Sequence, residues 1–519
     1  MTKPEHMLSS CSRLAGVLSG IIAVCFAALA VLIVLTKTAY LFELLPTVIA
    51  AAGAGALLVL AGAMLFFRNK LRNVLTGTAA HLENKMTYRS AWIILAALSV
   101  GTKILSIVVF GIDSLVHPDI NTYVVTAQEL ANQGSAVTYA TYCWSFPHMY
   151  WFAHFLMPVV GVFGANHTAL AVYLTLVSTI SVLLLFDTAR KHLPLATAFV
   201  IFVVYALLPA QVLLPSFITH EHALMLFLSM TIWLVFKVIP SIPREKKLLK
   251  TVLYGFSSIT LLLATQMNAA ALVAVIALCI VYLLLGISKG SAKGIGCALA
   301  KCTVLILIVA IGGSLLTDYQ ETHSQLKENT IQTNRVVWTL YVGSNAETNG
   351  QWSSQDVEKF EDIQALTSEN QIDEYRKNLL AARYRELFQN PSNLLALLKG
   401  KLSTIWSCFT YPLAYANELI PNGALQAIYN RFLFKPLVCL EYGISMLLAL
   451  LMACSLFGKS RKPVSPFMLF TQLYLLGNTA MLLLTECSNK YTIAIQPFFV
   501  IACLGLSVMG ECTKDTRQK

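Results

Sequence analysis

Long apolar runs recur along the chain and constrain its fold more than any other feature. Runs of about 17–22 residues are long enough to cross the hydrocarbon core of a bilayer as helices. Twelve such spans are predicted, near residues 14–36, 46–67, 91–110, 168–186, 195–213, 223–239, 251–266, 269–287, 302–317, 436–457, 465–485 and 491–510. Charged residues make up only 12% of the chain, whereas soluble domains carry about 25%. The sequence therefore predicts an all-α polytopic membrane protein, and it excludes a soluble enzyme, a disordered chain and a secreted disulfide scaffold.

The charges between the spans alternate in sign along the chain. One set of loops, together with both termini, sums to +17, mostly through short clusters of Lys and Arg. The connections at 111–148 and 318–401 each sum to −3. By the positive-inside rule, the basic loops and both termini face the cytoplasm, and segments 111–148 and 318–435 face outward across the plasma membrane. The net charge of +11 is then a result of topology, and it indicates no nucleic-acid partner.

The first outward segment, 111–148, holds three acids and neither Lys nor Arg. Asp119 opens a stretch with helical spacing, for which Pro118 suits the first turn and Gly134 suits the end. Asp119 is either an acid favoured by the dipole of that helix or a general base at the membrane surface. Asp113 is likewise either a solvated loop acid or a catalytic one.

Two outward stretches are expected to form helices that do not span the membrane. The apolar and aromatic residues 150–164 are too few for a span and predict an interfacial helix. Residues 318–435 are too polar to lie in lipid and predict a small helical layer, in which 343–352 is rich in turn residues and Asn390 precedes a Pro that starts a helix. Outward loops of this length are usually functional, and a cover over a lipid-facing site is one such role.

Three ionisable residues gather at the outward start of the span near 223–239. His220, Glu221 and His222 would be costly at this depth unless they were paired or functional. Glu221 would complement the helix dipole, and the three together could hold a divalent cation. The i, i+2 spacing does not place both imidazoles on one helical face. The sequence thus leaves a divalent cation open and indicates no other cofactor.

Lys490 departs from the charge rule because it is a lysine on the outward side. It lies in the tight turn 486–491 between the last two spans. One reading is a side chain that merely snorkels to the membrane surface. The other is a cation that binds a phosphate group.

These features, in this order, resemble the GT-C superfamily of membrane glycosyltransferases. The similarity is closest to bacterial protein O-mannosyltransferases and aminoarabinose transferases. The residues that carry it are Asp119 with Tyr123, the aromatic and Pro residues of 144–148, Glu221, the Gly- and Asn-rich stretch 343–352, Asn390-Pro391, and Glu486, Lys490 and Tyr491 with Pro497. The resemblance covers roughly residues 91–510, so a GT-C-like bundle of about twelve helices is expected.

The resemblance implies a polyprenyl-phosphate-linked sugar as donor. It also implies inverting transfer to a glycan, lipid or protein acceptor at the outer face. Asp119 would be the base on the acceptor hydroxyl, with Asp113 and Glu221 as further catalytic candidates. Lys490 would contact the donor phosphate, where the family usually has an Arg-Tyr pair, so a point charge replaces a bidentate fork. The candidate substrate-binding residues are Lys490, Tyr491, Tyr123, His220, His222, His148 and Arg335.

Four regions are expected on this interpretation. Residues 1–85 form an accessory transmembrane hairpin, and 86–317 form the GT-C-like core with the catalytic first outer loop. Residues 318–435 form a mainly helical outer region. Residues 436–519 hold the last transmembrane helices and a cytoplasmic tail.

Two other functions fit parts of the sequence. A polysaccharide ligase or polymerase that uses polyprenyl-linked glycans would also carry a long late outer loop, with essential Arg and His residues such as Arg335, Arg383 and His323. A secondary transporter or flippase would need ionisable residues near the membrane midplane. Lys103 and Glu441 are the deepest such residues in the predicted spans.

Overall fold

The structure, a computed structural model, describes residues 85–243, 245–326, 335–364, 368–407, 411–456 and 465–508, and isolated residues elsewhere. Within these ranges the chain forms helices and turns, with one isolated β-bridge between Ala136 and Ser324. Eight of the described helices are long and apolar enough to cross a membrane, and nine if the bent pair at Leu195–Leu207 and Pro209–Ser216 is one span. The all-α architecture with several helices long and apolar enough to cross a membrane is therefore confirmed, whereas the count of twelve spans stays a prediction, since the predicted spans at 14–36 and 46–67 lie outside these ranges.

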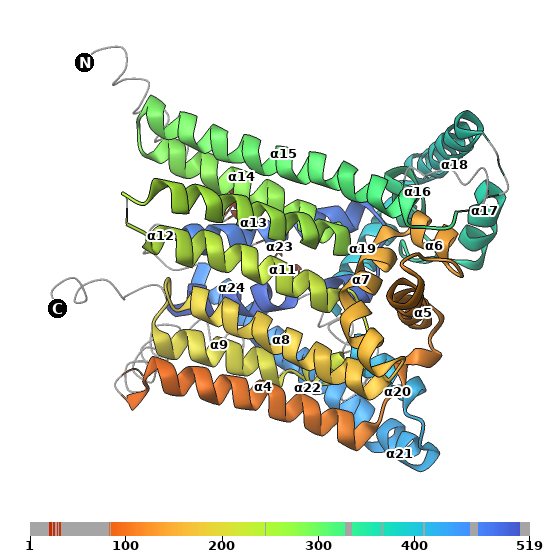
Figure 1. Cartoon of the computed structure of the whole chain (residues 1–519), viewed down its shortest axis with the longest axis horizontal. Coiled ribbons are helices and arrows are strands. Elements are labelled where there is room, and N and C mark those ends of the chain that lie inside the picture. Colours follow the sequence, from red (N-terminus) through yellow and green to blue (C-terminus); the bar gives the residue numbers. More distant parts are fainter. Residues whose placement is uncertain are drawn as a thin grey trace.

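The long helices run side by side in one bundle (Figure 1). They are α4 (Tyr88–Phe110), α8 (His167–Ala189), α9 (Leu195–Leu207), α11 (Glu221–Trp233), α13 (Lys247–Met267), α14 (Ala270–Ser288), α15 (Ala292–Thr322), α22 (Phe434–Leu456), α23 (Pro466–Leu484) and α24 (Gln496–Val508). Helix α11 packs between α8 and α13, and α14 packs against α15 and α23. Each of the ten remaining predicted spans overlaps one of these helices.

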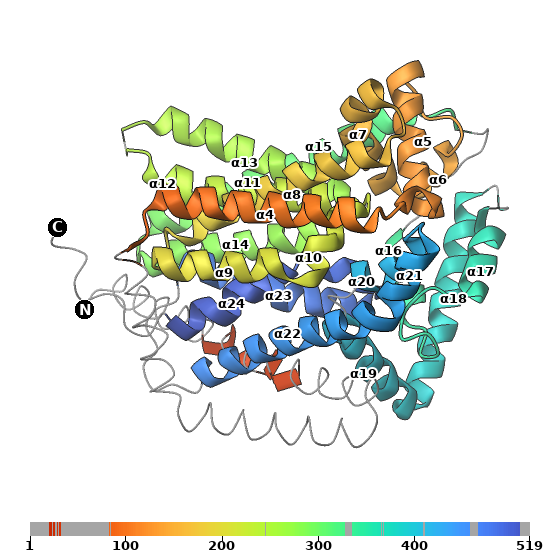
Figure 2. The ribbon, with the colours of Figure 1, turned by 90° about the horizontal axis from the view of Figure 1, so that it is seen from below.

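Nine of the other described helices gather at one end of the bundle, which we call the loop end (Figures 1 and 2). They are α5 (Pro118–Gln133), α6 (Ala140–Ser145), α7 (Pro147–Phe163), α16 (Arg335–Gly343), α17 (Ser354–Gln364), α18 (Glu369–Gln389), α19 (Pro391–Ser407), α20 (Tyr411–Leu419) and α21 (Gly423–Ile428). Pro118 and Gly134 bound α5 as predicted, and Gly134 takes the left-handed conformation with φ 72°. Helix α7 covers the stretch predicted to form an interfacial helix, and it buries Tyr150 and Phe152 completely in its packing, mainly against α5.

The predicted span near 195–213 is broken. Pro209 starts the short helix α10 (Pro209–Leu213), and the segment Pro209–Ser216 departs by 64° from the direction of α9, since proline cannot continue the hydrogen-bond ladder. The backbone N–H of Ala210 is satisfied by Glu441 Oε2 at 3.2 Å, and Gln496 Nε2 donates to Glu441 Oε1 at 2.8 Å. The deep acid Glu441 therefore holds the broken backbone in place.

Asp187 joins three long helices at the other end of the bundle. Its carboxylate accepts hydrogen bonds from Tyr88 Oη at 3.0 Å and from Trp233 Nε1 at 2.8 Å. It also pairs with Arg190 at 2.7 Å and with Lys237. Asp187, at the end of α8, thus links α8 to α4 through Tyr88 and to the end of α11 through Trp233 and Lys237.

We expect Asp187→Asn to lower the free energy of unfolding by about 1–2 kcal/mol, because it leaves two cations without a counter-charge at a partly buried position. The measurement is the thermal unfolding midpoint in detergent. Asp373→Asn is the matched control, since Asp373 pairs with Lys377 at 3.9 Å on an exposed helix surface. Equal midpoints for the two variants would contradict a structural role for Asp187.

Candidate functional site

Two predicted site residues from distant parts of the chain meet at the loop end. Asp119 lies in the first turn of α5, and Lys490 lies in the short helix η5 (Asn489–Thr492) that follows α23. Lys490 Nζ is 3.8 Å from Asp119 Oδ2. The side chains remain 28% and 35% exposed, respectively, so a ligand can reach both charged groups.

Tyr142 is a part of this site that sequence reasoning did not identify. It lies on α6, and its hydroxyl donates to Asp119 Oδ1 at 3.3 Å. Burial raises the pKa of Tyr142, and the neighbouring Asp119 carboxylate raises it further. The phenol therefore stays protonated and helps to orient the carboxylate. No local motif marks Tyr142 among the tyrosines of the first loop.

Glu486 and Tyr491 form a second pair beside Lys490. Tyr491 Oη donates to Glu486 Oε1 at 2.8 Å. Burial raises the pKa of Glu486, and Lys490 lowers it. Burial also raises the pKa of Tyr491, with Glu486 as the next cause. Tyr491, predicted to bind substrate, thus has its hydroxyl engaged by Glu486 in this structure.

The turn that carries Lys490 is held by a buried lysine on α19. Lys401 Nζ donates to the carbonyl oxygens of Leu483 and Thr485 at 2.9 and 2.6 Å, where α23 ends. The backbone N–H groups of Glu486 and Cys487 donate to carbonyls of α16 and of the turn that follows it. The cation satisfies carbonyls that a helix end leaves unbonded. The sequence predicts the helix that starts after Asn390, but no pattern in it predicts this contact of Lys401.

We expect Lys401→Met to lower the free energy of unfolding by about 1–3 kcal/mol, because it keeps the apolar stem but leaves buried carbonyl groups without donors. The exposed Lys399 on the same helix provides the control variant Lys399→Met. Thermal midpoints of the purified proteins measure the difference. A Lys401→Met midpoint equal to that of the control would show that the contact contributes little.

The three residues at the start of α11 are all buried but face different partners. His220 Nδ1 lies 3.1 Å from Tyr123 Oη, whereas His222 Nε2 lies 3.3 Å from the Leu214 carbonyl oxygen. Glu221 is 1% exposed. The two imidazoles diverge, as the i, i+2 spacing predicted. In the part of the chain that the structure describes, no three His, Cys, Asp or Glu residues are grouped to hold a metal ion.

Glu221 faces the same polar region as Asp119 and Lys490. Burial raises the pKa of Tyr411 on α20, and the carboxyl groups of Glu221 and Asp119 both raise it further. Burial lowers the pKa of His220 to about 3, with Lys490 as the next cause. Asp119 and Glu221 therefore both lie close enough to Tyr411 to shift its pKa. Lys490 lies close enough to His220, the neighbour of Glu221 in the chain, to shift the pKa of that ring.

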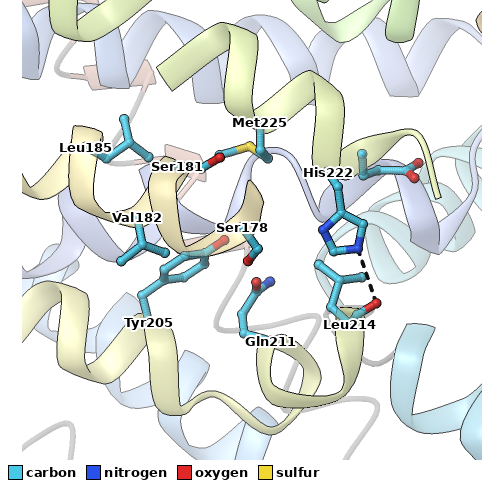
Figure 3. Close-up of a pocket in the computed structure, with 10 residues that line it drawn as sticks. Ser178, Ser181, Val182, Leu185, Tyr205, Gln211, Leu214, His222 and Met225 are labelled. Atoms are coloured by element: carbon cyan, nitrogen blue, oxygen red, sulfur yellow. Dashed lines mark hydrogen bonds between the residues drawn. The ribbon is translucent and has the colours of Figure 1, made fainter. Parts of the chain in front are cut away.

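A small cavity lies inside the bundle, beside the start of α11 (Figure 3). Its volume is about 10 Å³, room for about one water molecule. Its polar wall includes Ser178, Ser181, Tyr205, Gln211, Glu221 and His222. Lys103, which is 1% exposed, donates to Ser178 Oγ at 2.7 Å and to Ser99 Oγ at 3.0 Å. The cavity is too small for a sugar. Lys103 contacts Ser178, which is one of the residues that line the cavity.

The other predicted site residues have varied surroundings. Asp113 accepts from the backbone N–H of Leu115 at 3.1 Å and caps the short helix η1 (Ser114–Val116), which is a local structural contact. The His148 ring lies 4.5 Å from that of His220, beside the site. Arg335 begins α16, and its side chain lies outside what the structure describes.

The loop end thus combines the Asp119–Lys490 pair and the phenol of Tyr142, which donates to Asp119. The buried carboxyl group of Glu221 lies beside them. Comparison with models of known protein families finds no match for this chain. Comparison with curated protein sequences finds none either. A proposed function must therefore rest on the chemistry of these side chains.

Proposed function

We propose that this protein is a membrane glycosyltransferase of the GT-C type, which moves a sugar from a polyprenyl-phosphate donor to an acceptor hydroxyl. The observation that carries the proposal is the partly exposed pair of Asp119 and Lys490, 3.8 Å apart at the loop end of an apolar bundle. Inverting transfer from a lipid phosphate needs a base for the acceptor and a cation for the departing phosphate. The pair supplies both groups in one place.

The proposed topology follows from the distribution of charge. A bundle of about twelve spans in the plasma membrane has both termini and the basic loops in the cytoplasm and the loop end outside. The donor headgroup then reaches the site from the outer leaflet, and the lipid tail stays in the membrane beside the bundle.

In the proposed reaction, the donor phosphate takes Asp119's place beside Lys490. Asp119 then keeps its hydrogen bond from Tyr142 and is free to accept a proton. The acceptor hydroxyl gives this proton to Asp119 as its oxygen bonds to the anomeric carbon. The bond between that carbon and the phosphate oxygen breaks, and its electron pair stays on the phosphate, next to Lys490.

The contacts of other residues favour this function over the two alternatives. Glu441, which a transporter could use, is bonded to Ala210 and Gln496. Arg383, which a ligase could use, lies 5.1 Å from the centre of the Tyr341 ring and 4.0 Å from Asp356. Both side chains therefore have structural partners within the fold.

The experiment that tests the proposal is a transfer assay with the purified protein in lipid nanodiscs. Labelled hexosyl and pentosyl polyprenyl phosphates serve as donors, and a membrane extract fractionated into glycans, lipids and proteins serves as acceptor. We expect label to move from one donor class to one acceptor class. Vectorial movement of a donor across vesicles of this protein, without transfer, would instead identify a transporter.

A further inference from the structure

The three carboxyl groups near Lys490 raise a problem of charge for a phosphate-binding site. Asp119 lies 3.8 Å from Lys490, and Lys490 also interacts electrostatically with Glu221 and Glu486. If all three carboxyl groups were ionised, one lysine could not balance them, and the cluster would repel a phosphate. The site can accept an anion only if carboxyl groups in it carry protons.

The orientation of Asn268 identifies which ring nitrogen of His220 carries the proton. Asn268 Oδ1 accepts from the backbone N–H of Ala270 at 2.9 Å, so its Nδ2 is the atom that faces His220, 3.3 Å from Nε2. An amide nitrogen donates and does not accept. His220 Nε2 must therefore be the acceptor and bears no proton.

The rest of the His220 ring agrees with this assignment. Burial keeps the pKa of His220 low, at about 3, so the ring is neutral at ordinary pH. A neutral imidazole carries one proton, which must then lie on Nδ1, where Tyr123 Oη is 3.1 Å away. The tautomer of His220 is thus set by Asn268 on one side and by Tyr123 on the other.

Glu221 faces the unprotonated side of this ring. Its Oε1 is 3.3 Å from His220 Nε2, and the side chain of the preceding Thr219 also interacts with the carboxyl group. An ionised carboxylate would set its charge against the Nε2 lone pair, at a position that is 1% exposed. A protonated carboxyl group removes this repulsion, and because Asn268 already donates to that lone pair, the O–H of Glu221 is left to donate to another acceptor.

We propose that Glu221 is a protonated carboxyl group that donates a hydrogen bond to an anionic oxygen of the donor phosphate. This inference rests on the proposed function, and it gives Glu221 the role of a neutral donor in place of a catalytic base. Lys490 then supplies the positive charge, and Asp119 remains the proposed base. The polar and titratable groups around Glu221 are Lys490, His220, His222, Thr219, Tyr123, Tyr411 and Tyr491 and, across the small cavity, Ser178, Ser181, Tyr205 and Gln211.

Infrared spectroscopy tests the proton directly on the full-length protein in nanodiscs. We expect the carbonyl band of a protonated carboxylic acid at neutral pH, and we expect Glu221→Gln to remove intensity from it. Glu129→Gln is the control, because Glu129 lies in the same outer region but accepts hydrogen bonds from the N–H groups of Val137 and Thr138. If Glu221→Gln leaves the band unchanged, Glu221 is ionised and the inference is overturned, whether or not the protein transfers sugar.

Binding of polyprenyl phosphate tests the hydrogen bond. Glutamine keeps an N–H donor in the same shape, so Glu221→Gln should bind within about threefold of the wild type, whereas Glu221→Met should bind about tenfold or more weakly. A carboxylate that acts as a base or holds a cation would make the two variants equally poor in transfer assays, which would overturn the donor role. If the wild type binds no polyprenyl phosphate, the proposed function fails, and the infrared band still reports the proton on Glu221.

Discussion

Replacement of Asp119 by Asn is expected to abolish sugar transfer while the protein still folds and inserts. Asparagine has nearly the same shape, and its amide oxygen can accept the hydrogen bond from Tyr142, but it cannot take a proton from the acceptor hydroxyl. Loss of a general base lowers the rate about 10²–10⁴-fold. The measurement is the turnover of a labelled polyprenyl-phosphate sugar at saturating acceptor.

Donor binding separates loss of catalysis from loss of the site. Asp119→Asn removes the carboxylate that competes with the phosphate for Lys490, so donor affinity should be unchanged or higher. A parallel fall in donor affinity and turnover would indicate that the substitution disturbs the site as a whole. Full turnover in Asp119→Asn would remove Asp119 as the base.

Asp113→Asn is the matched control within the same loop. Asp113 accepts one backbone hydrogen bond at the start of η1, and asparagine caps helices about as well as aspartate. Turnover and thermal midpoint should both stay close to wild type. If this variant were inactive, the base would have to be sought at Asp113.

The helical bundle could be predicted because lipid leaves the backbone few alternatives. A chain in the bilayer must satisfy its own N–H and C=O groups, so an apolar run of sufficient length becomes a helix. The break at Pro209 was not predicted, although the proline is visible in the sequence. It depends on Glu441, a residue far along the chain that satisfies the backbone of the new helix. The packing of α7 against α5 could not be predicted, because burial against another helix and burial in lipid select the same apolar residues.

The candidate site could be predicted only in part. The charge rule placed Asp119 and Lys490 on one side, and the resemblance gave them roles, but no sequence pattern gives their separation. Tyr142 and Lys401 are common residue types, and their contacts join segments far apart in the chain, so no local pattern marked them. His222 points away because two residues along a helix rotate the side chain by about 200°.

Lys490→Met is expected to weaken binding of polyprenyl phosphate about 10–100-fold, since a charge-assisted hydrogen bond contributes roughly 1.5–3 kcal/mol. Methionine keeps most of the apolar length, so thermal stability should change much less than donor affinity. Lys490→Arg should keep most of the affinity, because a guanidinium also pairs with phosphate and can do so with two hydrogen bonds. Titration of the purified variants in nanodiscs measures both effects. If Lys490→Met bound the phosphate as well as the wild type, the lysine would serve only to neutralise Asp119, and the phosphate would have to bind elsewhere.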